Sequence, residues 1–406
     1  MWDGQCRYSS FIIHHSSFIL MPSILFVAGD LSGDGNSARL LLEVRRRNPD
    51  WSFSALGGPH LKATGARMIG DSSRCGVIGI APALMLLPRL LRLRRRTLQF
   101  LQHQKIDAVV LCDWGAFNGR LLSHLQAAKV PILYYFPPGS WRKSGQGGSG
   151  IAPFVSRVAT PFEWSAKRLR EAGAQAEWVG HPILETVQPL ADDAPERLQL
   201  RRELGVPHGA KLVALLPGSR ALELKYIAPH LAAAAPMLRA SSAQGELHFI
   251  AAIPRGAGEK IKKYFPSWME IVEERAADVL MACDAAIVKS GTATLEAAVA
   301  DAPQVVVYDG PALMRAQWKL TGARHVPFVA MPNIILEREA VPELLGEKCR
   351  AAPIAIALTK MLRDNALRAQ VRADYALVRR ALGEELPLGA TQRTAQILDE
   401  MLCAAT

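Results

Sequence analysis

The sequence contains no apolar run of the roughly 18 to 20 residues that a helix needs to cross a bilayer, so no transmembrane segment is expected. Its six cysteines are scattered, without a Cys-x-x-Cys pair or any spacing typical of a metal site. We therefore expect reduced thiols and a cytoplasmic protein. No DxD-like motif follows a predicted strand, so the sequence implies neither a metal ion nor another cofactor.

Acidic residues are the scarcer charge: 37 Asp and Glu stand against 48 Lys and Arg, which gives a formal net charge of +11. Such an excess favours an anionic partner. Much of it lies in two runs, at 44–48 and 88–96. Neither run contains interleaved aromatic residues or a nucleic-acid-binding motif, so nucleic acid is not expected as the partner. The first run is interpreted as a solvated helix face.

The first twenty residues lack the cationic start and the small-residue cleavage site of a secretory signal. Met21 is followed at once by "PSILFVAG", which has the pattern of a first strand. We therefore expect residues 1–20 to be a disordered extension or an upstream mistranslation.

A chain of 406 residues is too long for one ordinary hydrophobic core, so two domains are expected. Its apolar residues alternate between the patterns of buried strands and of amphipathic helices. Strands are expected at 23–29, 52–57, 107–112, 131–136, 176–179, 211–216, 246–251, 284–288 and 303–307. Helices are expected at 35–47, at 80–104 with a break at Pro88, at 117–129, 164–172 and 221–238, and throughout 353–404.

This order predicts the α/β class, with two Rossmann-like parallel sheets facing a cleft and helices at the C-terminal end. Ligands of such an architecture bind between the two halves. The segment 187–209, rich in proline and in charged residues, marks the connection between the two predicted domains. The predicted division is an extension at 1–20, a first domain at 21–186, a linker at 187–209, a second domain at 210–350 and terminal helices at 351–406.

The stretch "LLPGSRALE" (215–223) joins a predicted buried strand to a predicted helix. A Gly-Ser turn there leaves backbone N–H groups pointing outward at the positive end of the helix dipole, which makes an anion site. The guanidinium of Arg220 adds a planar donor fork suited to phosphate. Gly218, Ser219 and Arg220 are therefore candidate phosphate ligands, although such a turn also serves merely to turn and cap the chain.

The stretch "AGDLSGDGNSA" (28–38) is a glycine-rich turn that departs from the G-x-G-x-x-G fingerprint. The carboxylates of Asp30 and Asp34 would repel a phosphate, so we expect this loop to receive a hydroxyl-bearing acceptor. Ser32, Gly33 and Asp34 are the candidate contacts. Ser32 and Asp34 could equally be helix caps.

The stretch "VVLCDWGAFN" (109–118) places Asp113 at the carboxyl end of a predicted buried strand, where open α/β sheets carry their chemistry. A carboxylate at that place can accept a proton from an attacking alcohol. A capping role for Asp113 is the open alternative.

The stretch "AAIVKSGTATLEAAV" (285–299) repeats the strand–turn–helix pattern. Ser290, Gly291 and Thr292 form a second candidate anion site, with capping as the alternative for Thr292. Glu296 lies about one helical turn inside. A carboxylate there can accept two hydrogen bonds from a ribose diol, as an acidic residue does in dinucleotide-binding folds.

The stretches "GDLSGDG", "CDWGAFN", "LLPGSRALE", "KSGTATLE" and "MPNIILEREAVPELL" (331–345) occur in the order and spacing of the lipid-A-disaccharide synthases, and the chain resembles that family from about residue 23 to the terminal helices. Its members are inverting glycosyltransferases of the GT-B type. The resemblance implies a UDP-diacylglucosamine donor and a diacylglucosamine 1-phosphate acceptor, which yield a β-1,6-linked disaccharide and UDP. It also implies a cytoplasmic enzyme, peripheral on the inner face of the cytoplasmic membrane.

The resemblance also assigns roles to residues. Asp113 matches the proposed general base, and Asp30 stands at the position of an acidic loop residue that is usually Glu, so both are candidate catalytic residues. Arg220 and Asn333 match residues at the donor diphosphate and uridine, and Glu296 matches the carboxylate near the ribose. The candidate acceptor-side residues are Ser32, Gly33, Asp34, Asn118 and Trp141.

The chain departs from the family pattern at several places on the acceptor side. Ala116 replaces the second aspartate of the family's "DAPDFN". The tryptophan-rich segment of the family has become a Gly/Ser-rich stretch at 136–150, which keeps Trp141. These changes bear on the identity of the acceptor more than on the donor or the reaction.

The expected mechanism follows from these roles. Asp113 deprotonates the acceptor hydroxyl as it attacks the anomeric carbon from the face opposite UDP, through an oxocarbenium-like state. Arg220 and the N–H groups at two helix starts stabilise the leaving UDP.

The basic stretch at 81–102 has leucines at helical spacing with arginines on the other side. We expect it to dock on an anionic membrane surface, because a lipid-linked substrate must be reached there. The alternative is a helix that buries its leucines in its own core. The predicted docking residues are Leu87, Leu90, Leu91, Arg92 and Arg95.

The expected partners are thus a UDP-sugar, a lipid acceptor and an anionic membrane, with a homodimer considered possible. Three other functions stay open at this point. They are a UDP-sugar transferase with a different acceptor, a UDP-sugar epimerase of the same architecture, and a non-catalytic binder of sugar nucleotides or lipids.

Overall fold

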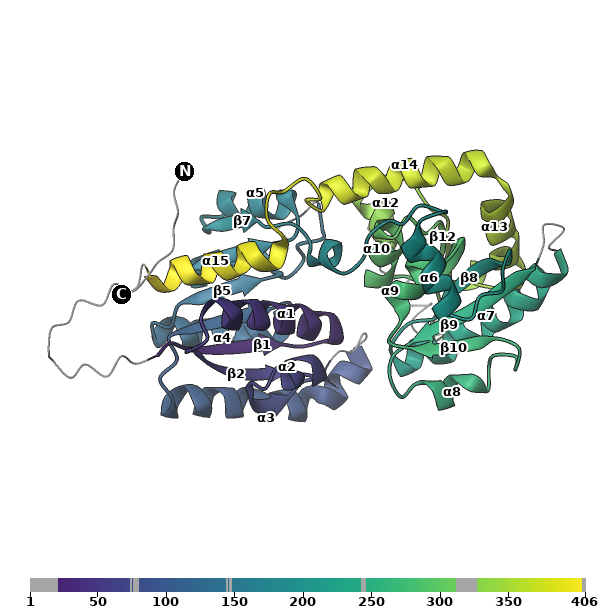
Figure 1. Cartoon of the computed structure of the whole chain (residues 1–406). Helices are drawn as coiled ribbons and strands as arrows, with labels where there is room; N and C mark the ends of the chain where they lie inside the picture. Colours follow the sequence, from purple (N-terminus) through teal and green to yellow (C-terminus); the bar gives the residue numbers. More distant parts are fainter. Residues whose placement is uncertain are drawn as a thin grey trace, which may run out of the picture.

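The computed structural model describes residues 21–403 except 74, 76–79, 144, 146–147, 242–245 and 312–326. The expected extension at 1–20 lies outside the described residues. Two halves, each built around one sheet, lie side by side, and α14 (Asn365–Ala381) runs along the top of the second half toward the first (Figure 1).

The first half contains a seven-stranded sheet in the order β3-β2-β1-β4-β5-β6-β7, and every strand pair is parallel. Its strands are β1 (Ser23–Ala28), β2 (Ser52–Gly57), β3 (Arg67–Asp71), β4 (Ala108–Cys112), β5 (Ile132–Tyr135), β6 (Arg157–Thr160) and β7 (Ala176–Trp178). The helices between them are α1 (Leu31–Arg47), α2 (Pro59–Ala63), α3 (Ile80–His103), α4 (Gly115–Ala127) and α5 (Glu163–Glu171). Two short 3₁₀ helices follow β5 and β7, η1 (Ser149–Phe154) and η2 (Pro182–Glu185).

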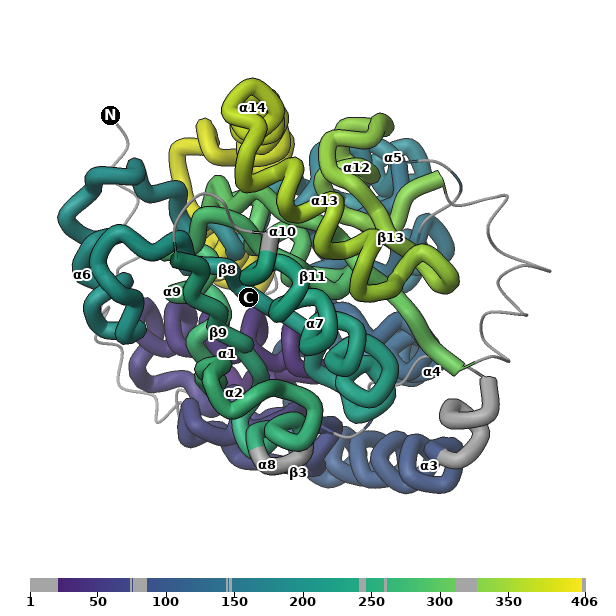
Figure 2. Tube along the Cα trace, turned by 90° about the vertical axis from the view of Figure 1, so that its right-hand side faces the viewer, coloured from purple at the N-terminus to yellow at the C-terminus, as the bar shows by residue number. Residues whose placement is uncertain are grey.

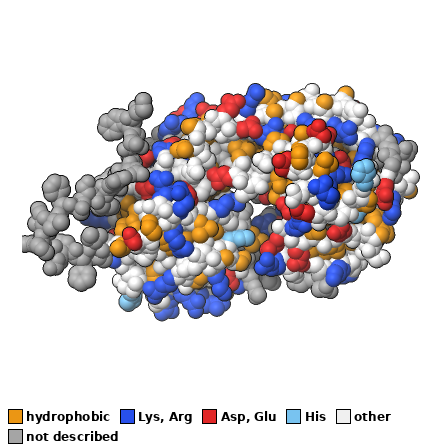
Figure 3. Space-filling model, in the orientation of Figure 1, with side chains coloured by type: hydrophobic (Ala, Val, Ile, Leu, Met, Phe, Trp, Pro, Cys, Tyr) orange, Lys and Arg blue, Asp and Glu red, His pale blue; other side chains and the backbone are white. Residues whose placement is uncertain are grey.

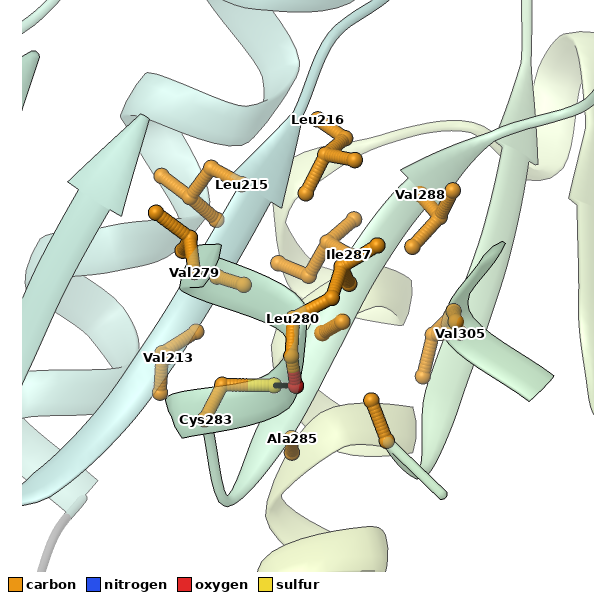
Figure 4. Packing of buried hydrophobic residues seen from close by; sticks show 14 of the residues in the cluster. Val213, Leu215, Leu216, Val279, Leu280, Cys283, Ala285, Ile287, Val288 and Val305 are labelled. Atoms are coloured by element: carbon orange, nitrogen blue, oxygen red, sulfur yellow. Dashed lines mark hydrogen bonds between the residues drawn. The ribbon is translucent and has the colours of Figure 1, made fainter. Parts of the chain in front are cut away.

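The second half contains a six-stranded parallel sheet in the order β10-β9-β8-β11-β12-β13. Its strands are β8 (Lys211–Leu216), β9 (Leu247–Ile253), β10 (Glu270–Glu273), β11 (Ala285–Lys289), β12 (Gln304–Tyr308) and β13 (Glu343–Leu345). Its helices include α6 (Pro195–Glu203), α7 (Ala221–Ser241), α8 (Gly258–Lys262), α9 (Ala276–Ala282), α10 (Thr292–Val299), α12 (Met331–Leu336), the short η3 (Gly346–Lys348) and α13 (Ala351–Arg363). Figure 4 shows β8, β11 and α9 burying Val213, Ile287 and Leu280 against one another.

The strand order reverses at one point in each sheet, between β1 and β4 and between β8 and β11. In open α/β sheets the ligand crevice lies outside the carboxyl ends of the strands at this point. The stretch after β1 contains Asp30, and Asp113 follows β4. The stretch after β8 contains Arg220, and the turn around Gly291 follows β11. Both pairs of predicted motifs therefore lie at the switch points of their sheets.

The chain crosses between the halves twice, and the two crossings touch each other. The N–H of His181 donates to the carbonyl of Leu382 (2.8 Å), and a Cβ on Gly383 would lie 3.0 Å from the Cα of Gly180. After the second crossing, α15 (Ala390–Cys403) packs with its apolar face in the core of the first sheet, beside α1. The last helix is thus part of the first half in space.

The predicted α/β class with two parallel sheets is confirmed. All nine expected strands are present, whereas the short strands β3, β6, β10 and β13 were not expected. Part of the expected linker at 187–209 is helical: α6 packs on the second half, where Arg197 and Arg201 each lie 3.1 Å from Asp284. Among the helices that the structure describes, none combines the length and the hydropathy needed to span a membrane.

Two helices differ from the prediction for physical reasons. Helix α1 begins at Leu31 rather than at residue 35, because Asp30 caps it. Helix α3 is continuous through Pro88, where a break was predicted. A proline inside a helix removes one backbone hydrogen bond and crowds the preceding turn. Leu90 and Leu93, which follow Pro88, pack against the core of the first half and support the helix beyond the proline.

Candidate active site

The loop after β4 holds Asp113 in an unusual backbone conformation. Asp113 and Trp114 have φ angles of +46° and +45°, in the left-handed region that non-glycine residues seldom adopt. The carbonyl of Asp113 accepts hydrogen bonds from Asn118 Nδ2 (2.8 Å) and from the Tyr134 hydroxyl (2.8 Å). These bonds fix the loop, and such maintained strain is typical of functional sites. Asn118, expected as an acceptor contact, instead supports Asp113.

Burial raises the pKa of the Asp113 carboxyl to about 6, and the negative charge of Asp30 adds to this rise. A hydrogen bond from the backbone N–H of Trp114 opposes it. A carboxylate of this kind is mostly ionised at neutral pH yet basic enough to accept a proton, as a general base must be.

Asp30 caps α1, and its carboxylate accepts hydrogen bonds from the N–H of Gly33 (2.8 Å) and from the hydroxyl of Ser32 (3.1 Å). A Cβ on Gly33 would lie 3.2 Å from Asp30 Oδ1 and 3.7 Å from Asp113 Cβ, so glycine lets the start of α1 approach the base. Asp30 therefore has a capping role and supplies negative charge beside Asp113.

Asp34 does not face an acceptor site, contrary to expectation. Its side chain is buried, and its carboxylate accepts hydrogen bonds from the N–H groups of Gly58 (2.7 Å), His60 (2.8 Å) and Leu61 (3.2 Å). These groups belong to the start of α2, whose donors have no partner within their own helix. Asp34 thus fastens α2 to α1.

The turn after β8 is also not the open anion site that was predicted. The N–H groups of Ser219 and Arg220 both donate to Glu223 Oε2, at 3.0 and 3.1 Å. Gly218 has φ +109°, and a Cβ on it would lie 2.6 Å from that same oxygen, so glycine is required for both reasons. The guanidinium of Arg220 also pairs with Glu223 (2.9 Å) and is the part of this turn left to meet a ligand.

The turn after β11 leaves its helix start open. Gly291 is the N-cap of α10, and no side chain of the described residues caps this helix. Thr292 is exposed at its first position, whereas the Ser290 hydroxyl donates to the carbonyl of Val329 (2.9 Å) and so serves the structure. The positive end of α10 is therefore available to an anion.

A cavity of about 470 Å³ lies between the halves, and the space-filling view is hollowed there (Figure 3). Ser32 lines it from α1, while Thr292 and Glu296 line it from α10. Burial raises the pKa of Glu296, and the positive charge of Arg39 opposes this rise. Three of the predicted residues, from helices of the two halves, thus meet at one cavity.

Arg39, His60 and His181 also line this cavity, and sequence reasoning did not identify them. Arg39 lies seven residues after Ser32 and hence on the same helix face, which is a usable signal in retrospect. Burial, with the charge of Arg39 second, lowers the pKa of His181 to about 3. Its Nδ1 accepts the N–H of Ile183 (3.1 Å), so the neutral ring has its proton on Nε2.

Asn333, expected at the uridine, is fully buried and fully hydrogen-bonded within the protein. Its Nδ2 donates to the carbonyl of Val341 (2.8 Å) and to Glu343 Oε1 (2.9 Å). Its Oδ1 accepts from the N–H groups of Ala340 (2.8 Å) and Val341 (2.9 Å). An amide offers no further strong hydrogen-bonding capacity, so Asn333 organises the segment after α12 rather than a ligand.

Trp141 is half-buried and packs against the large core of the second half. The neighbouring Lys143 pairs with Glu337 beyond α12 (3.3 Å). The loop after β5, predicted on the acceptor side, therefore contacts both halves. Its acceptor role stays a prediction.

Helix α3 exposes part of its predicted docking face. Leu87 and Leu91 are 39% and 52% exposed, and Arg92 and Arg95 are exposed beside them. Leu90 is the exception, because it is partly buried against the first core. Figure 3 shows basic side chains gathered along the lower edge of the first half, over α3, and Figures 1 and 2 place α14 at the opposite edge.

In the part of the chain that the structure describes, no group of three or more His, Cys, Asp or Glu side chains is placed to hold a metal ion.

A family model described as Lipid-A-disaccharide synthetase matches residues 24–398. The lipid-A-disaccharide synthase of Prochlorococcus marinus (strain MIT 9313) is 35% identical over 93% of this chain and 99% of its own length. That of Myxococcus xanthus (strain DK1622) is 34% identical over 94% of this chain and 98% of its own length.

Solved structures show the same fold. The S. aureus MnaA–UDP co-structure has a TM-score of 0.63 at 13% identity and covers 94% of this chain and 97% of its own. UDP-GlcNAc 2-epimerase from Neisseria meningitidis bound to UDP-GlcNAc has a TM-score of 0.61 at 11% identity, with 94% and 100% covered. The glycosyltransferase SnogD from Streptomyces nogalater has a TM-score of 0.55 at 16% identity, with 94% and 100% covered. At these identities the likeness concerns the fold alone.

Proposed function

The chain belongs to the lipid-A-disaccharide synthase family, and on that basis we propose that it is an inverting glycosyltransferase. It moves an acylated glucosamine from UDP to a lipid-linked glucosamine 1-phosphate. The observation that carries this proposal is the meeting of two sheet switch points at one cavity. Ser32 lines this cavity from the start of α1, which approaches Asp113 at Gly33. Thr292 and Glu296 line it from the helix after β11, the strand beside β8 and its Arg220 turn. Asp113 and Arg220 themselves are not among the lining residues.

The acceptor hydroxyl is activated at Asp113. At neutral pH this carboxylate is above its pKa of about 6 and is mostly ionised, so it can accept the proton as the oxygen attacks the anomeric carbon. The carbonyl of Asp113 is held by Asn118 and Tyr134, which keeps the base in place at no cost during the reaction.

The leaving UDP is held on the second half. Arg220 and the open N-terminus of α10 face its diphosphate, and Glu296 accepts hydrogen bonds from the ribose. The bond between the anomeric carbon and the diphosphate oxygen breaks with its electron pair on UDP. These groups oppose that growing negative charge.

Product analysis tests this function. The full chain is incubated with UDP-diacylglucosamine and diacylglucosamine 1-phosphate, and mass spectrometry should detect a disaccharide and free UDP in equal amounts. A panel of other lipid acceptors tests whether the departures from the family pattern on the acceptor side have changed which acceptor is used. UDP-N-acetylglucosamine alone should stay unchanged; its conversion without an acceptor would indicate an epimerase, and UDP binding without any product would contradict catalysis.

We further propose that the chain attaches to the membrane surface through α3. A peripheral position on the inner face of the cytoplasmic membrane brings the cleft to its lipid acceptor. The exposed Leu87 and Leu91, flanked by Arg92 and Arg95, combine apolar insertion with attraction to anionic lipid.

Vesicle flotation checks this attachment. We expect the chain to float with vesicles that contain anionic phosphatidylglycerol and not with neutral ones. The double variant Leu87→Ser/Leu91→Ser should lose flotation, whereas Leu377→Ser on α14, equally exposed but at the opposite edge, should keep it. Binding that ignores lipid charge would contradict docking by α3.

A further inference from the structure

Lys289, the last residue of β11, is a nearly buried ammonium at the donor switch point. Its side chain is 11% exposed, and its Nζ lies 2.8 Å from Glu223 Oε1. It also lies 5.7 Å from the centre of the Tyr308 ring, and 3.3 Å from where a Cβ on Gly291 would be. A lysine is seldom buried without a reason, because removing its charge from water is costly. Its ammonium stands between the starts of α7 and α10.

The charges around Lys289 do not balance. Glu223, 7% exposed, receives the guanidinium of Arg220 and the ammonium of Lys289 on Oε1, at 2.9 and 2.8 Å. Its other oxygen accepts the two N–H groups of the turn. Among the described residues of this cluster, two positive side chains therefore face one negative side chain, which leaves a net positive charge. The open N-terminus of α10 adds to it through Gly291.

Glu223 also determines which groups are free to meet an anion. Since it occupies the N–H groups of Ser219 and Arg220, these cannot serve a phosphate while Glu223 stays in place. The cationic side chains and the start of α10 are left. This differs from a phosphate loop, in which the backbone itself holds the anion.

Resting on the proposed function, we infer that Lys289 binds the diphosphate of the nucleotide-sugar donor together with Arg220. Glu223 is a positioning residue that holds the two cations side by side and keeps the turn closed. The ligand class is a nucleoside diphosphate. Its charge completes the neutralisation that Glu223 leaves unfinished, which is the physical reason for a buried ammonium at this place.

The competing interpretation is a purely structural ion pair between Lys289 and Glu223. In that case the loss of Lys289 would lower stability and would weaken every ligand of this half alike. A diphosphate ligand predicts a different pattern, because only nucleotides with the charged group would lose affinity. The comparison of UDP with uridine therefore separates the two.

Calorimetric titration of the full chain makes this comparison. Lys289→Met should weaken UDP binding by about 10- to 100-fold, the effect of losing one charge-assisted hydrogen bond, and leave uridine affinity unchanged. Lys289→Arg should restore most of the UDP affinity. The control Lys360→Met, in a separate groove between α7 and α13, should bind both ligands as the parent does.

A second background guards against misfolding of the single variant. In Glu223→Gln, where no buried carboxylate is left unpaired, adding Lys289→Met should still lower UDP affinity and spare uridine. Equal losses for UDP and uridine in both backgrounds, or no loss in either, would overturn the assignment of Lys289. A parent chain that binds no uridine nucleotide would instead overturn the proposed function itself.

Discussion

Asp113→Asn is expected to slow disaccharide formation by about 100- to 10,000-fold, the usual contribution of a general base, while UDP affinity stays nearly unchanged. The amide keeps the shape of the carboxyl but cannot take the acceptor proton. The measurement pairs a product assay with calorimetric titration of UDP. Asp50→Asn, an exposed change on the first half, is the matched control. If UDP affinity falls as far as turnover, Asp113 is structural.

The pH profile of the parent chain gives a second readout of the same residue. Only the ionised carboxylate acts as a base, so kcat/KM should level off above the pKa of about 6 and fall about tenfold for each pH unit below it. The residual activity of Asp113→Asn should lack this limb. A parent profile that stays flat down to pH 5 would contradict the role.

Asp113→Asn should also make the fold more stable at neutral pH. A folded-state pKa raised from 3.8 to about 6 means that the native state holds its proton more tightly than the unfolded chain. Ionisation therefore costs stability, and the cost develops between about pH 4 and pH 6 and reaches about 3 kcal/mol at pH 7. Urea unfolding at pH 7 and pH 4 should show a higher free energy of unfolding for Asp113→Asn than for the parent chain at pH 7 only.

The sequence pattern predicted the central strands and the switch points well, because strands buried on both faces need continuous apolar residues. "AVVLC" and "KLVALL" are of this kind, and the motifs that follow them lie where expected. The edge strand β3 differs from these strands, because none of its residues is buried. An edge strand has too little apolar surface to show itself in the pattern.

Chemical roles were harder to predict, because they depend on what else a polar group touches. Glu223 and Asn333 use their hydrogen-bonding groups on backbone that the fold brings to them. The motif "LPGSR" lies at the switch point of the second sheet, as expected, but its pattern did not show that Glu223 already occupies the N–H groups of its turn. Arg39 and His181 were missed because the cavity that they line is formed by two halves together.

For Asp34 the sequence indicated a role in acceptor binding, whereas the structure gives it a role in holding the fold together. Asp34→Ala is expected to lower the free energy of unfolding by about 3 kcal/mol. The change removes the acceptor of three N–H groups, of which those of Gly58 and Leu61 are fully enclosed. A Cβ on Gly58 would lie 2.8 Å from the Asp34 carboxylate, so that backbone fits closely around it and the site cannot easily admit water as a substitute.

Urea unfolding of Asp34→Ala measures this loss, with Asp50→Ala as the exposed control. Asp34→Asn should fall between the two, because its amide oxygen can still accept a hydrogen bond while its NH₂ group meets other donors. The KM for the lipid acceptor, measured on the fraction that stays folded, should be close to that of the parent. A normal unfolding curve with a raised acceptor KM would show instead that Asp34 binds substrate, as the sequence alone had indicated.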